Sequence, residues 1–472
     1  MHCHILVNLN SGCMTNRLLT RAFLFAFAIA ILQSCKNSEP IRPVTPPVVP
    51  TLSPCGSAVS YGYTDKVSYF PGDDIEVFLQ SSTTLNCGLD FYDIKGSVAF
   101  SSNVPLFTQL IWPTEPWANG YNFQFNGKIK LPSSTASGIY YIENKIPFVV
   151  KSATPAEITV VYPVNTINAY CNSGGESMYG FNSTNLIASR IVSFLRPLTE
   201  PTEEGACSEC LKWLPSLPNL KINYVSDLDL NDYTSFQSSK VLLIVGHSEY
   251  WTRNARKNFD RFVNAGKNAI VLSGNTMWWQ GRYSAKRDAL ICHRIAQLDP
   301  EPDPAMKTIL WVDPSLQYSI LSSIGADFNH GGYGLKSDNG WDGFKISNPA
   351  SPLLQGLNVK RGDIISLPTG EYDGAPVISF DAAGFPVLDN GLLKFEKLEL
   401  IGFDKGSRVG KETIGTFIVF QKTKTSGIII NAGSNSWCSL AGIGSSYSGD
   451  QLKKITSNAI TKLLVGDPVF SK

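Results

Sequence analysis

The sequence predicts two kinds of domain in one chain: an all-β domain, then a larger α/β domain with a doubly wound, mainly parallel sheet. Short apolar runs that alternate with polar residues and are broken by turn residues indicate the all-β domain, before about residue 152. A strand–helix–strand unit over residues 239–282, within a wider alternation of strands and helices, indicates the α/β domain. At 472 residues the chain is long enough for two or three domains.

The first 35 residues have the features of an export signal. Arg17 and Arg21 precede an apolar run, residues 22–32, that is too short to span a membrane as a mature helix. Because the signal makes sense only from Met14, we expect the true start there. The run ends at Cys35 and resembles a bacterial lipoprotein signal, with Cys35 as the lipid-bearing residue; an ordinary N-terminal membrane anchor is the alternative. We therefore expect a lipid-anchored protein of the cell envelope, periplasmic or at the cell surface, held by the outer or cytoplasmic membrane.

A proline-rich stretch separates this signal from the first domain. Residues 36–54 are too polar and too rich in proline to fold, so they predict a semi-rigid spacer. Residues 55–152 follow, where period-two patterns such as that at 75–79 predict an immunoglobulin-like β-sandwich without a catalytic constellation. Cys55 and Cys87 could form a disulfide in an oxidising compartment. We expect this domain to serve as a packing or spacing module.

The strand–helix–strand unit is the clearest part of the α/β domain. Residues 240–246 form a continuous apolar run, as expected for a strand that is covered on both faces. Thr252 is placed to cap the helix that follows, and Gly266 to end it. Residues 269–272 form the next strand. Ligands of open α/β sheets bind at the carboxyl ends of the strands, and both ends are polar here.

Other elements extend this domain over about residues 155–466. Residues 328–425 show little helical period and predict a β-rich insertion. The remaining predicted elements, in chain order, are a strand at 157–162, a helix around 187–195 that Pro197 ends, strands at 222–225 and 308–312, a helix at 314–324, a strand at 427–431, and a last helix with Leu452, Ile455, Ala459 and Leu463 on one face.

Composition and motifs exclude several functions. A net charge of +1 argues against a nucleic-acid partner. The absence of G-x-S-x-G, P-loop and G-x-G-x-x-G motifs argues against common serine-hydrolase, nucleotide and dinucleotide sites. The histidines left after cleavage of the signal, His247, His293 and His330, lack zinc-site spacing. Cys207 and Cys210 lie in an acidic loop, which favours a loop disulfide or two idle thiols over redox chemistry.

Polar side chains that could carry chemistry gather at the predicted strand ends. They are Tyr170 and Tyr179 after the first strand, His247 and Glu249 after the third, and Asn275 after the fourth. A carboxylate with two phenolates suits a hard cation and not zinc or copper. A nearby histidine could act as general base, and an amide could hold an oxyanion. Structural roles are the alternatives: core packing for the tyrosines, a salt bridge for the glutamate and a turn for the asparagine.

Five sequence blocks add a family resemblance. In order they are NTINAYCNSGGESMYGFN, VGHSEYWTRN, LSGNTMWWQGRY, TGEYDG and NAGSNSWCSL. Over roughly residues 160–464 the chain resembles the catalytic C-terminal region of the large (beta) subunit of N,N-dimethylformamidase and its relatives. The resemblance implies hydrolysis of the amide bond of small N-alkyl formamides at a mononuclear iron (Fe³⁺). Ser248, Cys171 and Cys438 depart from the family pattern, and the known enzyme is soluble and needs a small second subunit.

The resemblance also implies roles for single residues. It gives three iron ligands, Tyr170, Tyr179 and Glu249. His247 would lie beside the metal as a base or water-orienting group, and Asn275 would contact the substrate. Glu371, in the TGEYDG block, would be a further polar member of the site.

These observations leave three hypotheses about the function of the protein, of which the first two are the main ones. The first is a metal-dependent hydrolase of a small amide or related C–N bond, with Trp251, Trp278 and Trp279 as candidates for an apolar pocket wall, although core packing is favoured for at least two of them. The second is a non-catalytic envelope lipoprotein whose glutamine-amidotransferase-like α/β domain and sandwich bind a ligand, such as a glycan. The third is an inactive structural envelope protein. A homo-oligomer is compatible with each of them.

Overall fold

The computed structural model describes residues 52–108, 113–199, 202–334 and 340–472. The predicted signal, with Met14 and Cys35, and nearly all of the predicted spacer lie outside these residues. Residues 52–472 form one compact unit of mixed α/β structure with more strand than helix. Within the described residues, no helix combines the length and apolar character needed to cross a membrane.

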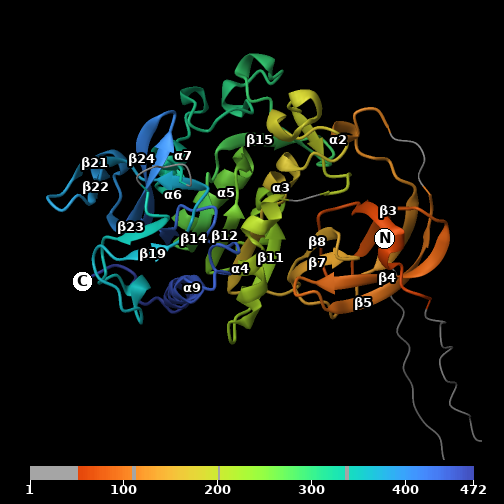
Figure 1. Cartoon of the computed structure of the whole chain (residues 1–472), viewed down its shortest axis with the longest axis horizontal. Helices are drawn as coiled ribbons and strands as arrows, with labels where there is room; N and C mark the ends of the chain where they lie inside the picture. Colours follow the sequence, from red (N-terminus) through yellow and green to blue (C-terminus); the bar gives the residue numbers. More distant parts are fainter. Residues whose placement is uncertain (1–51, 109–112, 200–201, 335–339) are drawn as a thin grey trace, which may run out of the picture. The chain divides into compact units, whose positions relative to one another are not determined.

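Two sheets form the N-terminal region, drawn mainly in orange in Figure 1. The three-stranded sheet has the order β1 (Val59–Thr64), β3 (Asp74–Ser81), β6 (Phe125–Lys130). The five-stranded sheet has the order β2 (Ser68–Tyr69), β8 (Ile146–Val150), β7 (Gly138–Ile142), β4 (Leu85–Asp93), β5 (Val98–Leu106). Ile75, Val77 and Leu79 are buried in a core that both sheets share, as the period-two pattern predicts. The predicted disulfide between Cys55 and Cys87 is confirmed.

An 11-stranded sheet is the centre of the remaining chain. Its order is β11 (Ile222–Ser226), β9 (Ile158–Tyr162), β12 (Val241–His247), β14 (Asn268–Gly274), β25 (Ile428–Asn431), β24 (Lys411–Gln421), β23 (Lys397–Arg408), β17 (Gly332–Tyr333), β20 (Glu371–Gly374). In addition, β18 (Gly343–Ile346) pairs with β23, and β19 (Ile364–Ser366) pairs with β18. The pairs from β11 to β25 are parallel, and those from β25 to β20 are antiparallel. The sheet is therefore parallel in one half only.

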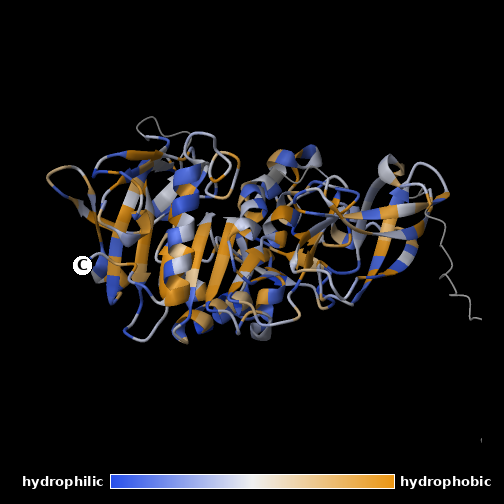
Figure 2. Ribbon diagram, turned by 90° about the horizontal axis from the view of Figure 1, so that it is seen from below, coloured by the Kyte–Doolittle hydropathy of each residue, from blue (hydrophilic) through white to orange (hydrophobic). Residues whose placement is uncertain are grey.

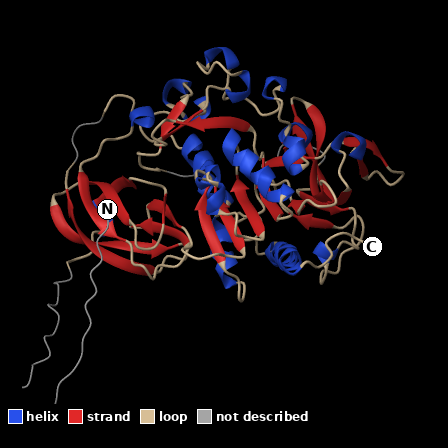
Figure 3. Cartoon of the chain, turned by 180° about the vertical axis from the view of Figure 1, so that it is seen from behind, coloured by secondary structure: helices blue, strands red, loops and turns tan. Residues whose placement is uncertain are grey.

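Alternate residues of β12 explain why both faces of the parallel half are covered. Leu242 and Ile244 pack in the core that contains α5 (Arg253–Asn264), whereas Val241, Leu243 and Val245 pack in the core that contains α9 (Gly449–Val465). A strand that is buried on both faces is a continuous apolar run in the sequence, as seen here. Figure 2 shows these strands in orange between helices that carry hydrophilic residues, and Figure 3 shows helices flanking the sheet.

Smaller elements complete the described fold. A four-stranded sheet has the order β10 (Ile191–Ser193), β16 (Ala289–Ile291), β15 (Trp279–Tyr283), β13 (Tyr250–Thr252), and β21 (Val377–Phe380) pairs with β22 (Pro386–Leu388). The short helices are α2 (Pro116–Asn119), α3 (Val164–Tyr170), α4 (Ser208–Trp213), α6 (Ile320–Ile324), α7 (Phe328–Gly331) and α8 (Asn390–Leu393).

Three predicted elements are wrong. The helix around 187–195 is instead a loop followed by β10, because Ile187, on the expected apolar face, is exposed to solvent. Residues 308–312 make a single isolated bridge and no strand. The helix at 314–324 is broken at Gln317, which has a left-handed φ of 50°. The region 328–425 is rich in strands, and its long strands β23 and β24 continue the main sheet.

Candidate active site

His247 and Glu249 lie at the carboxyl end of β12, beside the centre of the main sheet. The His247 Nδ1 atom lies 2.6 Å from Glu203 Oε2, and its Nε2 atom lies 3.0 Å from Glu371 Oε2 and 3.8 Å from Glu249 Oε2. Both His247 and Glu249 are buried. One imidazole therefore faces three carboxyl groups from three separate segments of the chain.

The two predicted tyrosine ligands lie together on the same site. Tyr170 ends α3, and its ring centroid is 4.2 Å from that of Tyr179 and 5.4 Å from that of His247. The Tyr179 hydroxyl donates a hydrogen bond of 2.6 Å to Glu249 Oε1. The structure thus brings together both tyrosines and the glutamate, although 70 residues separate Tyr179 from Glu249.

The remaining predicted residues join this cluster at its edge. Asn275, after β14, donates from Nδ2 to Glu371 Oε2 at 3.3 Å and has a left-handed φ of 50°. Glu371, in β20, is held through its backbone by Asn435: its amide donates to Asn435 Oδ1, and its carbonyl accepts from the Asn435 amide. Every predicted site residue in the described part of the chain therefore lies at one end of the main sheet.

Burial and neighbouring charges perturb the acid–base behaviour of the site. Burial raises the pKa of Glu249 from 4.5 to about 7, even though the nearby His247 acts to lower it. Burial acts to lower the pKa of His247, but the charges of Glu203 and Glu371 outweigh it and hold that pKa well above 6.5. Burial, followed by the charge of Glu249, raises the pKa of the Tyr170 and Tyr179 hydroxyls well above 10. Strongly perturbed groups in one cluster are typical of a functional site.

Three buried polar atoms of this cluster have no hydrogen-bond partner among the described residues: His247 Nε2, Glu249 Oε2 and Asn275 Oδ1. The 3.0 Å approach of His247 Nε2 to Glu371 is close enough for an ion pair but is not aligned as a hydrogen bond. A buried polar atom without a partner costs roughly 1–3 kcal/mol, so three such atoms in one cluster indicate that water or a ligand binds there.

The donor set of the cluster fits a hard cation. Phenol and carboxylate oxygens are the hard ligands that such a cation prefers, and Glu249 Oε2 accepts no hydrogen bond from the described residues. Within the described ranges, no group of three or more His, Cys, Asp or Glu side chains is arranged to hold a metal ion. A metal at this site would therefore depend on the tyrosine oxygens.

Sequence reasoning missed two charged residues of the site. Glu203 contacts His247 from 44 positions away, and Arg294 stacks on the Tyr179 ring with its Cζ atom 4.1 Å from the ring centroid. The sequence shows Glu203 only as one of two acidic residues in a loop, and Arg294 lies in a segment without a regular period. The positions of Glu203 and Arg294 in the sequence therefore predict neither the contact with His247 nor the contact with Tyr179.

The other single residues that the sequence suggested have structural positions. Trp251 and Trp278 are buried in the core around α5, so core packing is confirmed for these two. Trp279 is half buried, and its ring lies 4.9 Å from Arg294 Cζ. Cys207 and Cys210 are buried free thiols in the described structure, which excludes the loop disulfide between them.

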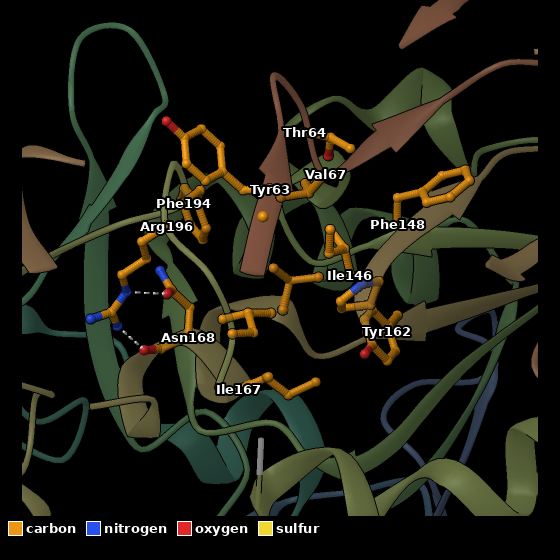
Figure 4. Close-up of a pocket in the computed structure, with 14 residues that line it drawn as sticks. Tyr63, Thr64, Val67, Ile146, Phe148, Tyr162, Ile167, Asn168, Phe194 and Arg196 are labelled. Atoms are coloured by element: carbon orange, nitrogen blue, oxygen red, sulfur yellow. Dashed lines mark hydrogen bonds between the residues drawn. The ribbon is translucent and has the colours of Figure 1, made fainter. Parts of the chain in front are cut away.

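A cavity between the N-terminal region and α3 is separate from the cluster. Figure 4 shows its apolar walls, which include Ile146, Phe148 and Ile167, and its charged wall residue Arg196. The Arg196 guanidinium is bonded to Asn168, with Nε 3.0 Å from Oδ1 and Nη2 2.6 Å from the carbonyl oxygen. The cavity has a volume of about 40 Å³. None of the predicted site residues lines it.

Comparison with known proteins shows the family to which the chain belongs. The family model described as N,N-dimethylformamidase beta subunit-like, C-terminal, matches residues 62–448. No curated protein matches the chain. Among solved structures, a protein described as ThuA-like from Bacteroides uniformis is similar over 68% of this chain and 96% of its own, with 10% sequence identity and a TM-score of 0.31. A likeness this distant adds nothing to the argument about the site.

Proposed function

Because the chain belongs to the N,N-dimethylformamidase beta subunit-like family, we propose that it is a metal-dependent hydrolase of a small amide or a related C–N bond. The observation that carries this proposal is the cluster at the carboxyl end of β12, where Tyr179 and Glu249 are in direct contact beside Tyr170 and His247. Buried polar atoms without partners converge there. A purely structural cluster would be expected to satisfy them.

We propose iron as the metal, with Tyr170, Tyr179 and Glu249 as its ligands. When bound, Fe³⁺ would supply Lewis acidity toward a carbonyl oxygen and would lower the pKa of a coordinated water. Burial and the charge of Glu249 hold the pKa of both phenols well above 10, so a bound cation would have to displace the two phenol protons.

The other residues of the cluster have roles in moving protons and orienting the substrate. Glu203 holds His247 through Nδ1, so that Nε2 faces Glu249 and Glu371. The raised pKa of His247 favours its protonated form, so its Nε2 can orient the attacking water and give a proton to the leaving amine, and it then recovers a proton from that water. Asn275 stands opposite Glu371, where its amide can hold the carbonyl oxygen of the substrate as negative charge develops.

Elemental analysis and a visible spectrum of residues 36–472 test this proposal. The wild type should bind iron near one equivalent and show a tyrosinate charge-transfer band, and Glu249→Gln should lose both. Glu204→Gln is the matched control, because Glu204 is the next residue after Glu203 but bonds to the Tyr162 hydroxyl instead of His247. A wild type without metal, even after anaerobic loading with iron, would disprove the mechanism. Hydrolysis of small amides is then screened with the metal-loaded protein.

A non-catalytic binding function has one observation in its favour. A cleft of about 670 Å³ lies between the N-terminal region and the α/β part, and polar and aromatic side chains line it, including Tyr61, Tyr141, Asn144 and Asn172. Such walls suit a carbohydrate, and we propose the cleft as the site of a binding protein if the chain holds no metal. Titration with a panel of glycans decides this alternative, since loss of binding on Tyr61→Ala would support it. In either case we propose that Cys35 anchors the protein in the cell envelope.

A further inference from the structure

Arg294 forms part of the wall of the candidate site through contacts with three aromatic side chains. Its Cζ atom lies 4.1 Å from the centroid of the Tyr179 ring and 4.9 Å from that of the Trp279 ring. Its Nη2 atom donates a hydrogen bond to the Tyr250 hydroxyl. Its Nε atom is buried and has no hydrogen-bond partner in the part of the chain that the structure describes. Ring faces and one hydroxyl therefore hold the cation, and no described carboxylate forms an ion pair with it.

The backbone of Arg294 is held in an unfavourable conformation by a network behind it. Its φ is +64°, in the left-handed region that a non-glycine residue rarely occupies. The Arg294 amide donates to the Thr308 carbonyl at 2.8 Å, and Thr308 donates to Asp299 from its amide at 2.7 Å and its hydroxyl at 2.6 Å. Arg282 binds both carboxyl oxygens of Asp299. Strain that surrounding contacts maintain is found most often at functional sites.

The position of this cation has an electrostatic consequence for Tyr179. A guanidinium on the face of an aromatic ring is attracted by the π electrons, and the attraction is strongest where water is excluded. The attraction grows when the ring becomes a phenolate, because the negative charge is delocalised over the ring. The charge of Arg294 acts to lower the pKa of Tyr179, although burial and Glu249 dominate.

We propose that Arg294 is a positioning residue of the metal site: it holds the Tyr179 ring against Glu249 and stabilises the negative charge that the Tyr179 oxygen carries as a metal ligand. This inference rests on the proposed function, which makes Tyr179 a ligand. Arg294 makes Tyr179 a weaker electron donor, so it leaves the metal a stronger Lewis acid. A role in loop packing alone would give stability but no such electronic effect.

The experiment compares iron-loaded wild type with Arg294→Gln, Arg294→Lys and a matched control, Arg256→Gln. Arg256 is buried and, like Arg294, stacked on aromatic rings, with Cζ 4.5 Å from the Trp311 ring centroid and 3.9 Å from that of Tyr318, but these rings are not part of the site. The measurements are iron per chain, the wavelength of the tyrosinate charge-transfer band, and the unfolding temperature.

Removal of the cation should make the Tyr179 phenolate a better donor, so the band of Arg294→Gln should move to longer wavelength. Arg294→Lys retains the charge and should shift the band less in the same direction, which keeps the test decisive if the glutamine variant does not fold. Arg256→Gln should unfold at a lower temperature with the band at its wild-type position.

An Arg294→Gln band at the wild-type wavelength, or an equal shift in Arg256→Gln, would overturn the role of Arg294 while leaving the hydrolase proposal intact. Loss of iron from both Arg294 variants, with the fold retained, would overturn it as well, because the retained charge of lysine should preserve the site. A wild type without iron or band would remove both proposals together.

Discussion

Replacement of Glu249 by glutamine should stabilise the metal-free protein at alkaline pH, although the same change removes a proposed metal ligand. The carboxyl is buried, its Oε2 atom has no partner, and burial raises its pKa from 4.5 to about 7. Between these two pH values the folded state holds a proton that the unfolded state has released. The free energy of unfolding therefore falls as the pH rises from about 4.5 to about 7.

The size of the effect follows from the pKa change. At about 1.4 kcal/mol for each pH unit, a change from 4.5 to about 7 costs about 3 kcal/mol of stability once the carboxyl is ionised in both states. Glutamine is uncharged and removes this cost. At pH 8 metal-free Glu249→Gln should exceed the wild type by up to about 3 kcal/mol, whereas at pH 5 the two should be nearly equal because Glu249 is neutral in the folded wild type.

Urea unfolding in the presence of a chelator, followed by tryptophan fluorescence at pH 5 and pH 8, measures the difference. Glu204→Gln is the control: Glu204 accepts hydrogen bonds from the Tyr141 and Tyr162 hydroxyls, so its replacement should destabilise the protein at both pH values by about 1–3 kcal/mol. The reasoning is refuted if metal-free Glu249→Gln is less stable than the wild type at pH 8, or if the two differ equally at pH 5 and pH 8. Addition of iron should reverse the order, since only the wild type gains stability from binding.

Three further predictions concern the frame of the site. Thr252→Ala removes the side-chain cap at the start of α5 and should cost about 1 kcal/mol in urea unfolding; no loss would show that the cap contributes nothing. Gly246→Ala should lower the amount of iron per chain, because φ is +75° and the added Cβ would lie 2.8 Å from the nearest side chain. Gly266→Ala is the control: its φ is +82°, the nearest atom to the added Cβ lies at 3.4 Å, and iron per chain should not change. Equal iron loss in both would contradict this. Burial acts to raise the pKa of Asp299, but its hydrogen bonds, chiefly those from Arg282, outweigh burial and hold that pKa well below 3.8. Such a carboxylate stabilises the folded state above its unfolded pKa, and this stabilisation is lost as the pH falls. Asp299→Asn should therefore lower the free energy of unfolding by about 2–3 kcal/mol at pH 7. The difference from the wild type should shrink below about pH 4 in an acid titration.

The parts of the fold that the sequence predicted well are those where local pattern and burial agree. The continuous apolar runs at 240–246 and 269–272 are strands β12 and β14. The Thr252 side chain caps the helix that begins at Arg253, as predicted. The predicted helix around 187–195 failed because its apolar residues are not all buried. A 3.6-residue period predicts a helix only when the periodic residues face a core, and here part of them face solvent.

The candidate site was predictable in part for a related reason. Residues that follow parallel strands meet at one edge of the sheet, which brings Glu249 and Asn275 together without knowledge of the loops. The strand ends also indicated Tyr170 and Tyr179, and the resemblance added their role as ligands and the residue Glu371. Glu203 and Arg294 reach the site from irregular segments whose paths depend on tertiary contacts, and no spacing in the sequence encodes such contacts.

Two adjacent glutamates connect the N-terminal region to the candidate site. Glu203 binds His247, and Glu204 accepts a hydrogen bond from Tyr141, which belongs to β7 and also lines the large cleft. A single peptide bond therefore joins Glu204, which contacts the wall of the cleft, to Glu203, which orients the His247 imidazole. If a molecule that enters the cleft shifts Tyr141, we expect the contact between Glu203 and His247 to change, and thermodynamic reciprocity then predicts that a ligand at the site changes affinity at the cleft. We therefore expect that removal of the preceding strands would change the surroundings of His247 at the edge of the main sheet.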